Sequence, residues 1–352
     1  MTQIAPLSLL SHLLFGFALF LLSVGICWYL ARHPIIMDIP NERSSHETPI
    51  PKSGGIAIVI TFLAGVIAIY ALADVAVIKD YFFLGFVCSA LLIAIVSFVD
   101  DLITTQFFFR LSSQALSALV VMVFGIVISE LTIPWVGKIQ MGLIGYVITF
   151  FWIVGLTNAF NFMDGINGLA GGTVVIVCLF FGHICATLGS NFAYIISYTI
   201  AAGALGFLLF NFPYAKLFMG DVGSAFLGFV FASLAVIAAL YDNSHTSLFV
   251  MPLLLLHFIY DTFFTFMRRL LKGEYVFEAH RTHLYQLFNQ LGFSHAKVSI
   301  FYWSVGIAQG FGAVWMVTIP DNRRLLVFLP YLIFQVLYSI IITRKALKNG
   351  LL

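Results

Sequence analysis

The sequence predicts an all-α membrane protein, a polytopic bundle of about eleven transmembrane helices. Of its 352 residues, 61% are hydrophobic and only 9% are charged, whereas soluble domains average about 25% charged residues. Apolar runs of roughly 20 residues, the length that crosses a bilayer as a helix, recur along the chain. Backbone groups in lipid need partners within their own segment, which favours helices. The alternating segments of a transmembrane barrel are absent from the sequence.

The apolar runs also predict an orientation. They lie near 9–30, 55–73, 81–99, 111–130, 142–158, 168–188, 192–210, 222–240, 247–267, 297–318 and 325–343. An odd number of spans puts the termini on opposite sides. With the N-terminus outside, thirteen of the 17 Lys and Arg residues fall in cytoplasmic segments and the other four outside. The positive-inside rule therefore predicts an outside (periplasmic) N-terminus and a cytoplasmic C-terminus.

The chain reads as one integral-membrane domain, 1–352, without internal repeats. The first span lacks the basic flank and cleavage site of a removable signal, so we expect it to be retained. The four cysteines lie in apolar runs without metal or disulfide spacing and are expected to be buried thiols. A net charge of +2 gives no indication of a nucleic-acid partner. We expect the site to be formed by cytoplasmic loops near 31–54, 100–110, 159–167, 211–221 and 268–297.

Four aspartates carry the chemical signal. Asp100 and Asp101 end the third span, Asp164 follows the fifth, and Asp221 opens the eighth. All four share one membrane level, so a helical bundle can bring them together. Neighbouring carboxylates repel unless a cation offsets them, and Mg²⁺ takes oxygen ligands from a few carboxylates and substrate phosphates. The sequence predicts a metal and a phosphate-bearing substrate, although a single acid at a helix end can equally be a cap.

Glycines surround two of these acids, in NAFNFMDGINGLAGG and KLFMGDVGS. Glycine lets backbone approach a ligand closely, and Asp221 with Ser224 would open a helix whose first amides suit an anion. The alternative is that glycines allow tight helix packing in lipid.

Two loops add basic residues. In the last long loop, His283 lies near Arg281, and this loop is long enough to cover the site; an ordinary interfacial histidine is the alternative. In the loop before the second span, Arg43, His46 and Lys52 suit a phosphate or merely signal topology.

Within the ninth span, His257 and Asp261 lie four residues apart on one helix face. An acid inside a span is a functional candidate by default. A packing pair remains an equal alternative.

Together these stretches resemble the polyprenyl-phosphate N-acetylhexosamine-1-phosphate transferases, which start O-antigen, teichoic-acid and peptidoglycan lipid intermediates in bacteria. The resemblance runs from about residue 32 to 295 through DD, NxxNxxDGxNGLAGG, FMGDxGS and a histidine motif. It implies transfer of an N-acetylamino-sugar 1-phosphate from a UDP-sugar to undecaprenyl phosphate, with release of UMP. It also implies Mg²⁺, with Mn²⁺ as a substitute, and a site on the cytoplasmic face of the bacterial inner membrane.

The resemblance assigns roles to individual positions. Asp221, with Asp101, is implied as metal ligand, and Phe218 as a stacking partner for uracil. Asp100 and Asp101 match paired acids that bind metal or deprotonate the lipid phosphate. The expected catalytic residues are Asp100, Asp101, Asp164 and His283, and the expected substrate-binding residues are Lys52, Arg110, Asn158, Asn161, Asn167, Phe218 and Arg281.

Two departures concern the donor sugar. Asn167 replaces an acid that family members often carry, and RTHLYQ keeps only His283 of a motif that often has adjacent histidines. The AHRTHLYQ form resembles the branch that transfers N-acetylfucosamine or N-acetylquinovosamine phosphates. N-acetylglucosamine stays open as donor, and a homodimer stays open as the assembly.

Two other activities are weighed against the transferase. An ion-coupled transporter predicts acids near the mid-plane in broken helices, whereas these acids lie mostly at one interface. A CDP-alcohol phosphatidyltransferase also uses aspartates and a divalent metal, but its clustered DG/AR/D/D pattern is missing.

Overall fold

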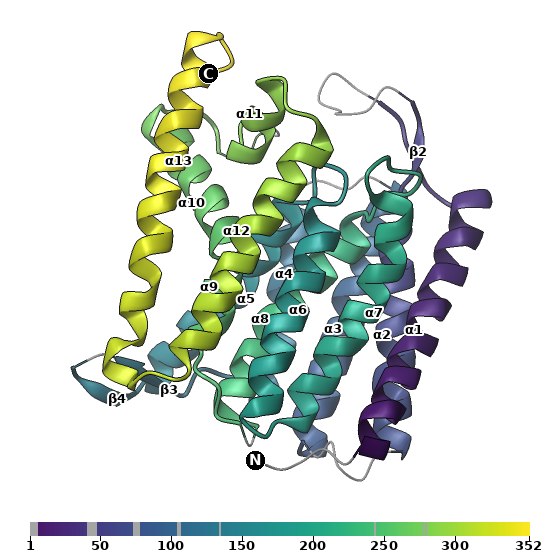
Figure 1. Ribbon diagram of the computed structural model, residues 1–352, viewed down its shortest axis with the longest axis vertical. Coiled ribbons are helices and arrows are strands. Elements are labelled where there is room, and N and C mark those ends of the chain that lie inside the picture. The colour runs from purple at the N-terminus through teal and green to yellow at the C-terminus, as the bar shows by residue number, and fades with distance from the viewer. Residues whose placement is uncertain are drawn as a thin grey trace.

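The computed structural model describes residues 6–40, 48–72, 78–103, 107–133, 135–242, 244–276, 278 and 280–352. Its long helices run side by side in one bundle (Figure 1). The longer helices are α1 (Pro6–Arg32), α2 (Gly54–Leu72), α3 (Asp80–Ile103), α4 (Phe107–Val123), α5 (Gly142–Phe162), α6 (Leu169–Thr187), α7 (Asn191–Asn211), α8 (Asp221–Leu240), α10 (Leu256–Leu271), α12 (His295–Met316) and α13 (Phe328–Lys348). Shorter elements are β1 (Met37–Asp38), β2 (Ile50–Pro51), β3 (Glu130–Ile133), β4 (Gly137–Gln140), α9 (Val250–Leu254), α11 (Leu284–Gln290) and the 3₁₀ helix η1 (Asp321–Val327).

The helical, multi-pass character predicted from composition is confirmed. Within the described residues, seven helices are long and apolar enough to cross a membrane, and two shorter apolar helices, Gly54–Ala68 and Phe107–Val123, lie beside them. Every predicted span overlaps at least one helix. The total of eleven spans and their orientation remain predictions. The span expected at 247–267 is divided into α9 and α10, which meet at Leu255 with φ −104° and ψ 14°.

The fourth expected span, 111–130, is too long. Helix α4 ends at Val123, and Gly125 adopts a φ of +82°, the left-handed conformation with which glycine commonly terminates a helix. Beyond it, β3 pairs antiparallel with β4 in a hairpin that the apolar pattern did not reveal. The Nζ of Lys138 lies 2.8 Å from a carboxylate oxygen of Glu130 across this hairpin.

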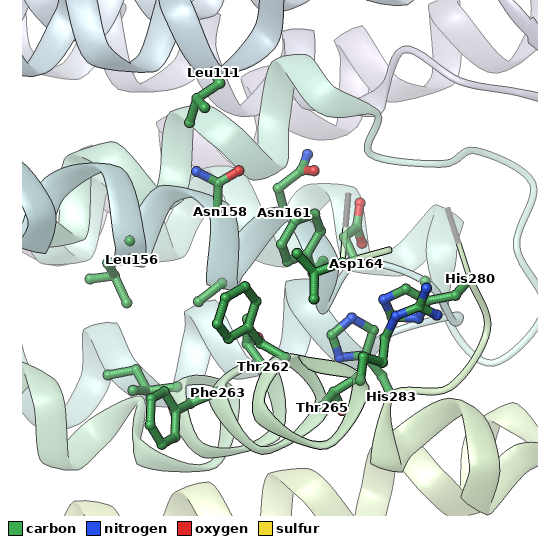
Figure 2. Close-up of a pocket in the computed structure, with 18 of the residues that line it drawn as sticks. Leu111, Leu156, Asn158, Asn161, Asp164, Thr262, Phe263, Thr265, His280 and His283 are labelled. Atoms are coloured by element: carbon green, nitrogen blue, oxygen red, sulfur yellow. The ribbon is translucent and has the colours of Figure 1, made fainter. Parts of the chain in front are cut away.

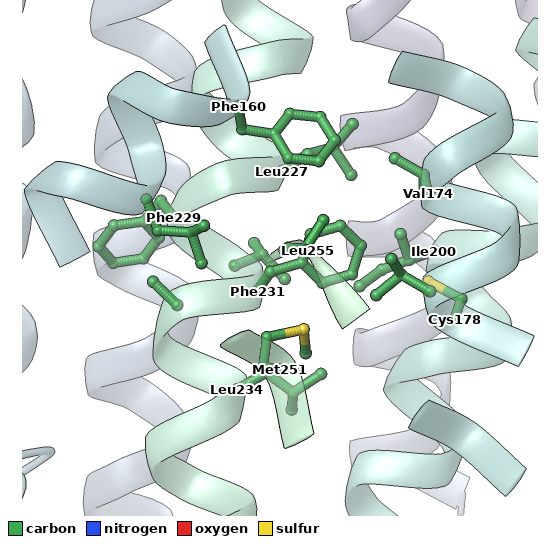
Figure 3. Packing of buried hydrophobic residues seen from close by; sticks show 14 of the residues in the cluster. Phe160, Val174, Cys178, Ile200, Leu227, Phe229, Phe231, Leu234, Met251 and Leu255 are labelled. Atoms are coloured by element: carbon green, nitrogen blue, oxygen red, sulfur yellow. The ribbon is translucent and has the colours of Figure 1, made fainter. Parts of the chain in front are cut away.

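The bundle has two distinct ends. Strand β2, helix α11 and the C-terminus lie at one end, and the β3–β4 hairpin lies at the other (Figure 1). Helix α8 fills the centre of the bundle, and its residues from Val222 to Ala238 are buried. The centre of the Phe160 ring lies 5.8 Å from that of the Phe231 ring (Figure 3). It lies 5.2 Å from the centre of the Phe258 ring. A Cβ on Gly228 would lie 2.7 Å from the Cα of Thr157, so α5 and α8 pack at backbone distance.

Backbone pairing joins the loop after α1 to the start of α8. The N–H of Phe218 donates to the carbonyl of Pro51, and the carbonyl of Phe218 accepts from Gly54, each at 2.8 Å. A Cβ on Gly55 would lie 2.3 Å from the amide nitrogen of Gly223, which explains the glycine at that position. Two loops about 170 residues apart in sequence thus meet at the end of the bundle that holds α11.

Candidate active site

Lys52 and Asp101 join the end of α3 to the start of α8. One oxygen of Asp101 accepts the N–H of Val222 at 3.0 Å, and the other lies 2.7 Å from the Nζ of Lys52. The same Nζ lies 4.0 Å from Asp221. Burial alone would lower the pKa of Lys52, but the carboxylates of Asp221 and Asp101 outweigh it and raise this pKa above its usual value. Lys52 is therefore charged at neutral pH and neutralises part of the cluster.

Arg110 bridges Asp100 and Asp221. Its Nε lies 2.5 Å from Asp100 and one terminal nitrogen lies 3.3 Å from Asp221. The adjacent acids Asp100 and Asp101 thus bind different cations, which relieves the repulsion expected between neighbours.

The last turn of α5 carries Asn161 and the turn that follows it carries Asp164, both beside Asp221. The Asn161 amide donates to Asp221 at 3.3 Å and to the Ser224 hydroxyl at 2.8 Å. Burial, followed by the negative charge of Asp221, raises the pKa of Asp164 well above its usual value. The structure therefore brings together the four predicted acids and two predicted cations.

The residues fit a divalent cation that substrate phosphates help to hold. Four carboxylates face two cationic side chains, Lys52 and Arg110, which leaves an excess of negative charge when all are ionised. In the described part of the chain, no three acidic, imidazole or thiol side chains form a complete metal cage. Mg²⁺ does not require one, because it usually takes one or two carboxylates and completes its shell with water and phosphate oxygens.

A cavity of about 890 Å³ opens beside this cluster. Asn158, Asn161 and Asp164 form one side of it and α10 forms the opposite side, with His283 at the end nearer Asp164 (Figure 2). The lining has a polar part and an aromatic part. Its polar members include Arg110, Asn158, Asn161, Asp164, Glu278, His280, His283 and Gln286, and its apolar members include Phe107, Leu111, Phe151, Trp152, Leu156, Ile259, Phe263 and Phe266.

Helix α11 closes the polar end of the cavity. The hydroxyl of Tyr285 donates to the carbonyl of Phe162 at 2.9 Å, directly against Gly165. His283, the residue before α11, places its ring 5.9 Å from that of Phe162. His283 and Tyr285, from the last long loop, thus line the cavity.

Other predicted residues lie away from the cavity lining. The Asn167 amide donates to the Pro213 carbonyl at 3.2 Å, and its own carbonyl accepts from Ser299 at 2.7 Å. Phe218 pairs through its backbone with the loop that carries Lys52. The Arg281 carbonyl accepts from Gln290. Arg43 and His46 lie outside the described residues.

Sequence reasoning missed Gln114, and it named Asp261 as a functional candidate but paired it with the wrong residue. Gln114 in α4 accepts a hydrogen bond from the Asn158 amide, which also donates to the carbonyl of Val154 at 2.9 Å. Asp261 binds α11, whereas His257, its expected partner, bonds through Nδ1 to Gln309 at 2.6 Å. The sequence did offer one signal for Gln114, because it is a polar residue inside an apolar run.

Comparisons with known proteins identify the family to which the chain is similar. The model of glycosyl transferase family 4 matches residues 83–239, which includes all four aspartates. A probable undecaprenyl-phosphate N-acetylglucosaminyl 1-phosphate transferase of Bacillus subtilis is 29% identical over 79% of this chain and 76% of that protein. A decaprenyl-phosphate N-acetylglucosaminephosphotransferase of Mycobacterium tuberculosis is 30% identical over 83% of this chain and 80% of that protein.

A shorter similarity links the chain to a second group of enzymes. A phospho-N-acetylmuramoyl-pentapeptide-transferase of Leuconostoc citreum is 40% identical over 34% of this chain and 38% of that protein. The long relatives and the family model together establish membership: the chain belongs to glycosyl transferase family 4, within the superfamily of polyprenyl-phosphate hexosamine-1-phosphate transferases.

Proposed function

We propose that the protein transfers an N-acetylamino-sugar 1-phosphate from a UDP-sugar to undecaprenyl phosphate and releases UMP. The product, a polyprenyl-diphospho-sugar, would begin a cell-envelope polysaccharide such as O-antigen at the cytoplasmic face of the inner membrane. The relatives support the reaction class, because their names give a polyprenyl phosphate and an N-acetylamino sugar.

The two-part cavity is the observation that carries this proposal. Its polar end has Arg110, Asn161 and Asp164, which suit a diphosphate. Its apolar part includes Phe151 and Phe263, whose exposed fractions are 68% and 62%. A substrate with a charged head and a hydrocarbon tail matches both parts, whereas an ion-coupled transporter needs no such apolar arm.

The transfer exchanges one phosphorus–oxygen bond for another. An oxygen of the lipid phosphate attacks the β-phosphorus of the UDP-sugar, and the bond from that phosphorus to the bridging oxygen breaks. The bridging electron pair leaves with UMP. Catalysis then consists of positioning and charge neutralisation. Arg110 and Lys52 supply positive charge beside the phosphates, and Asn161 holds Asp221 in place.

Proton removal needs little help in this reaction. A phosphate monoester has a second pKa near 6, so much of the lipid phosphate is already dianionic at pH 7. We first expected Asp100 or Asp101 to take the remaining proton. Asp164 lines the cavity, whereas Asp100 and Asp101 are absent from its lining and contact Arg110 and Lys52. We therefore assign that proton to Asp164 in place of the Asp100–Asp101 pair.

Asp221 and Asp101 would hold the metal. Mg²⁺, when bound, polarises phosphoryl oxygens and offsets the charge that develops on them. Asp101 also accepts the Val222 amide, and Asp221 accepts from Asn161, so both carboxylates are oriented without the metal.

The donor sugar is the finer part of the proposal. The AHRTHLYQ loop favours N-acetylfucosamine or N-acetylquinovosamine, while the names of the relatives favour N-acetylglucosamine. Both types belong in the same assay.

The proposal is tested with purified protein in nanodiscs that contain undecaprenyl phosphate and Mg²⁺. UMP release is measured for UDP-N-acetylglucosamine and the UDP-linked deoxy-N-acetylamino sugars, with UDP-glucose as a negative control. We expect UMP from at least one amino-sugar donor, and a loss in Asp164→Asn that is small at pH 7.5 and grows as the pH falls below about 6, where the lipid phosphate keeps its second proton. Folded protein that releases no UMP from any donor would overturn the proposed function.

A further inference from the structure

Asp261 is a carboxylate inside α10 with an exposed fraction of only 1%. Its Oδ1 accepts the N–H of Leu284 at 2.8 Å, and its Oδ2 accepts the N–H of Tyr285 at 3.1 Å. The hydroxyl of Tyr302 donates to the same Oδ2 at 2.8 Å. A side chain 23 residues upstream thus binds the first two amides of α11, which a residue at the helix start more often satisfies.

The same carboxylate orients a histidine. The Nδ1 of His283 lies 3.3 Å from Asp261 Oδ1. As a hydrogen bond, this contact requires the hydrogen on Nδ1, because a carboxylate oxygen can only accept; the lone pair of a neutral ring is then on Nε2. His283 lines the cavity and Asp261 is absent from its lining. Nε2 is therefore the nitrogen that can accept a hydrogen bond from a substrate in the cavity, while Nδ1 is bound to Asp261.

Through Tyr285, Asp261 also links the start of α11 to α5. Its bond to the Tyr285 amide holds one end of this residue, and the bond from the Tyr285 hydroxyl to Phe162 holds the other. Helix α11 is thereby fixed between α10 and the turn that carries Asp164.

We propose that Asp261 is a positioning residue of the transferase site that acts through His283. It holds the imidazole with Nε2 toward an O–H of the substrate, either a sugar hydroxyl or the acid proton of the lipid phosphate. The role in catalysis rests on the proposed function, whereas the anchoring of α11 does not.

The test begins with Asp261→Asn, which keeps size and removes the second acceptor oxygen. We expect kcat to fall about 100-fold, as displacement of a site group by about 1 Å does, with KM for either substrate changed less than threefold. In a double-mutant cycle, Asp261→Asn should add less than threefold to the loss caused by His283→Ala. Multiplicative losses would overturn the proposal, because they are what a purely structural role produces.

Tyr338→Phe is the matched control. It removes a buried hydroxyl that lies 3.3 Å from the Tyr302 hydroxyl, one contact further from Asp261. We expect kcat within twofold of wild type. A loss equal to that of Asp261→Asn would mean that any defect in this network inactivates the protein, and would refute the specific role of Asp261.

Two further measurements do not depend on turnover. Trypsin should cut after Arg281 at least tenfold faster in Asp261→Asn than in wild type or Tyr338→Phe, because α11 loses its anchor; equal rates would refute the anchoring.

If Asp261→Asn does not fold, ¹⁵N NMR of histidine-labelled wild-type protein, assigned with His283→Gln, gives the tautomer of His283. A hydrogen on Nε2 alone would overturn the proposal. Absence of UMP in wild type would instead refute the proposed function and leave the trypsin result valid.

Discussion

Replacing Gly165 by alanine tests the contact between Gly165 and Tyr285, which joins α11 to the end of the cavity near Asp164. Gly165 follows Asp164 in the turn that lines the cavity. A Cβ at this position would lie 2.0 Å from the hydroxyl oxygen of Tyr285 and 3.0 Å from the ring carbon that bears it. Tyr285 is 1% exposed and borders the cavity, so its side chain can move only by giving up its present contacts.

The size of the effect follows from that distance. Ordinary contact begins near 3.4 Å, so the hydroxyl must move by roughly 1.4 Å, which breaks its 2.9 Å bond to the Phe162 carbonyl. Overpacking costs about 1–3 kcal/mol, and the lost hydrogen bond costs about 1 kcal/mol more. Because the same movement displaces α11 and His283, we expect kcat to fall about 100-fold.

Gly155→Ala is the matched control for this variant. Gly155 also lines the cavity, from α5, but a Cβ there meets no atom within 4 Å. An alanine inside a helix is favoured over glycine by up to about 1 kcal/mol, so thermal unfolding should occur at the same or a higher temperature, with near-normal UMP release. Equal behaviour of Gly165→Ala and Gly155→Ala in both assays would refute the contact between α11 and the turn.

Three other changes test the charges around the site. Asp221→Asn should retain activity only at Mg²⁺ concentrations at least tenfold above those of wild type, and unchanged activity at limiting Mg²⁺ would remove it as a ligand. Arg110→Ala leaves Asp100 and Asp221 without a shared cation, so we expect KM for the lipid phosphate to rise about tenfold in a titration, and an unchanged KM would separate Arg110 from the acceptor. Burial, followed by the nearby His283, lowers the pKa of His280 to about 3. Between that value and about 6.5 the unfolded imidazole binds a proton that the folded one does not, so stability falls as the pH drops through this range. His280→Gln should reduce the decrease in melting temperature from pH 7.5 to pH 5, and an unchanged decrease would contradict this assignment.

The convergence of the acids was predictable from the sequence. Asp100, Asp101, Asp164 and Asp221 end or begin helices at one membrane level, and a bundle of parallel and antiparallel helices aligns such ends. Hydrophobicity fixes where each span ends, and therefore fixes the depth of its terminal acid. The structure adds that the nearest cations are Lys52, in the loop before α2, and Arg110, in the first turn of α4. Depth alone cannot supply this detail.

The partners of Asp261 were not predictable in the same way. Its spacing from His257 suggested a pair on one helix face, but the side chain instead binds backbone amides of α11. Such a contact depends on where a loop returns after leaving the bundle, which periodicity does not encode. The division of the ninth span at Leu255 was not predicted either, although Pro252 lies three residues before the break and α10 carries polar residues along one face.

Asn167 provides the sharpest comparison between sequence and structure, since its departure from the family pattern suggested a role in donor choice. Its side chain holds the loop before α8 through the Pro213 carbonyl, and its backbone is held by Ser299. A carboxylate cannot donate to that carbonyl, so Asn167→Asp should lose about 1 kcal/mol of stability and lower kcat/KM for every accepted donor alike.

The ratio of donors separates anchoring from recognition. If Asn167 only anchors the loop, the ratio of kcat/KM for a deoxy-N-acetylamino sugar over N-acetylglucosamine stays within twofold of wild type in Asn167→Asp. Direct recognition of the sugar instead changes this ratio, because a site that hydrogen-bonds a substrate group discriminates strongly against a donor without it. Because the side chain is already engaged with Pro213, away from the cavity lining, we expect the unchanged ratio. A shift of tenfold or more would return donor selection to this residue.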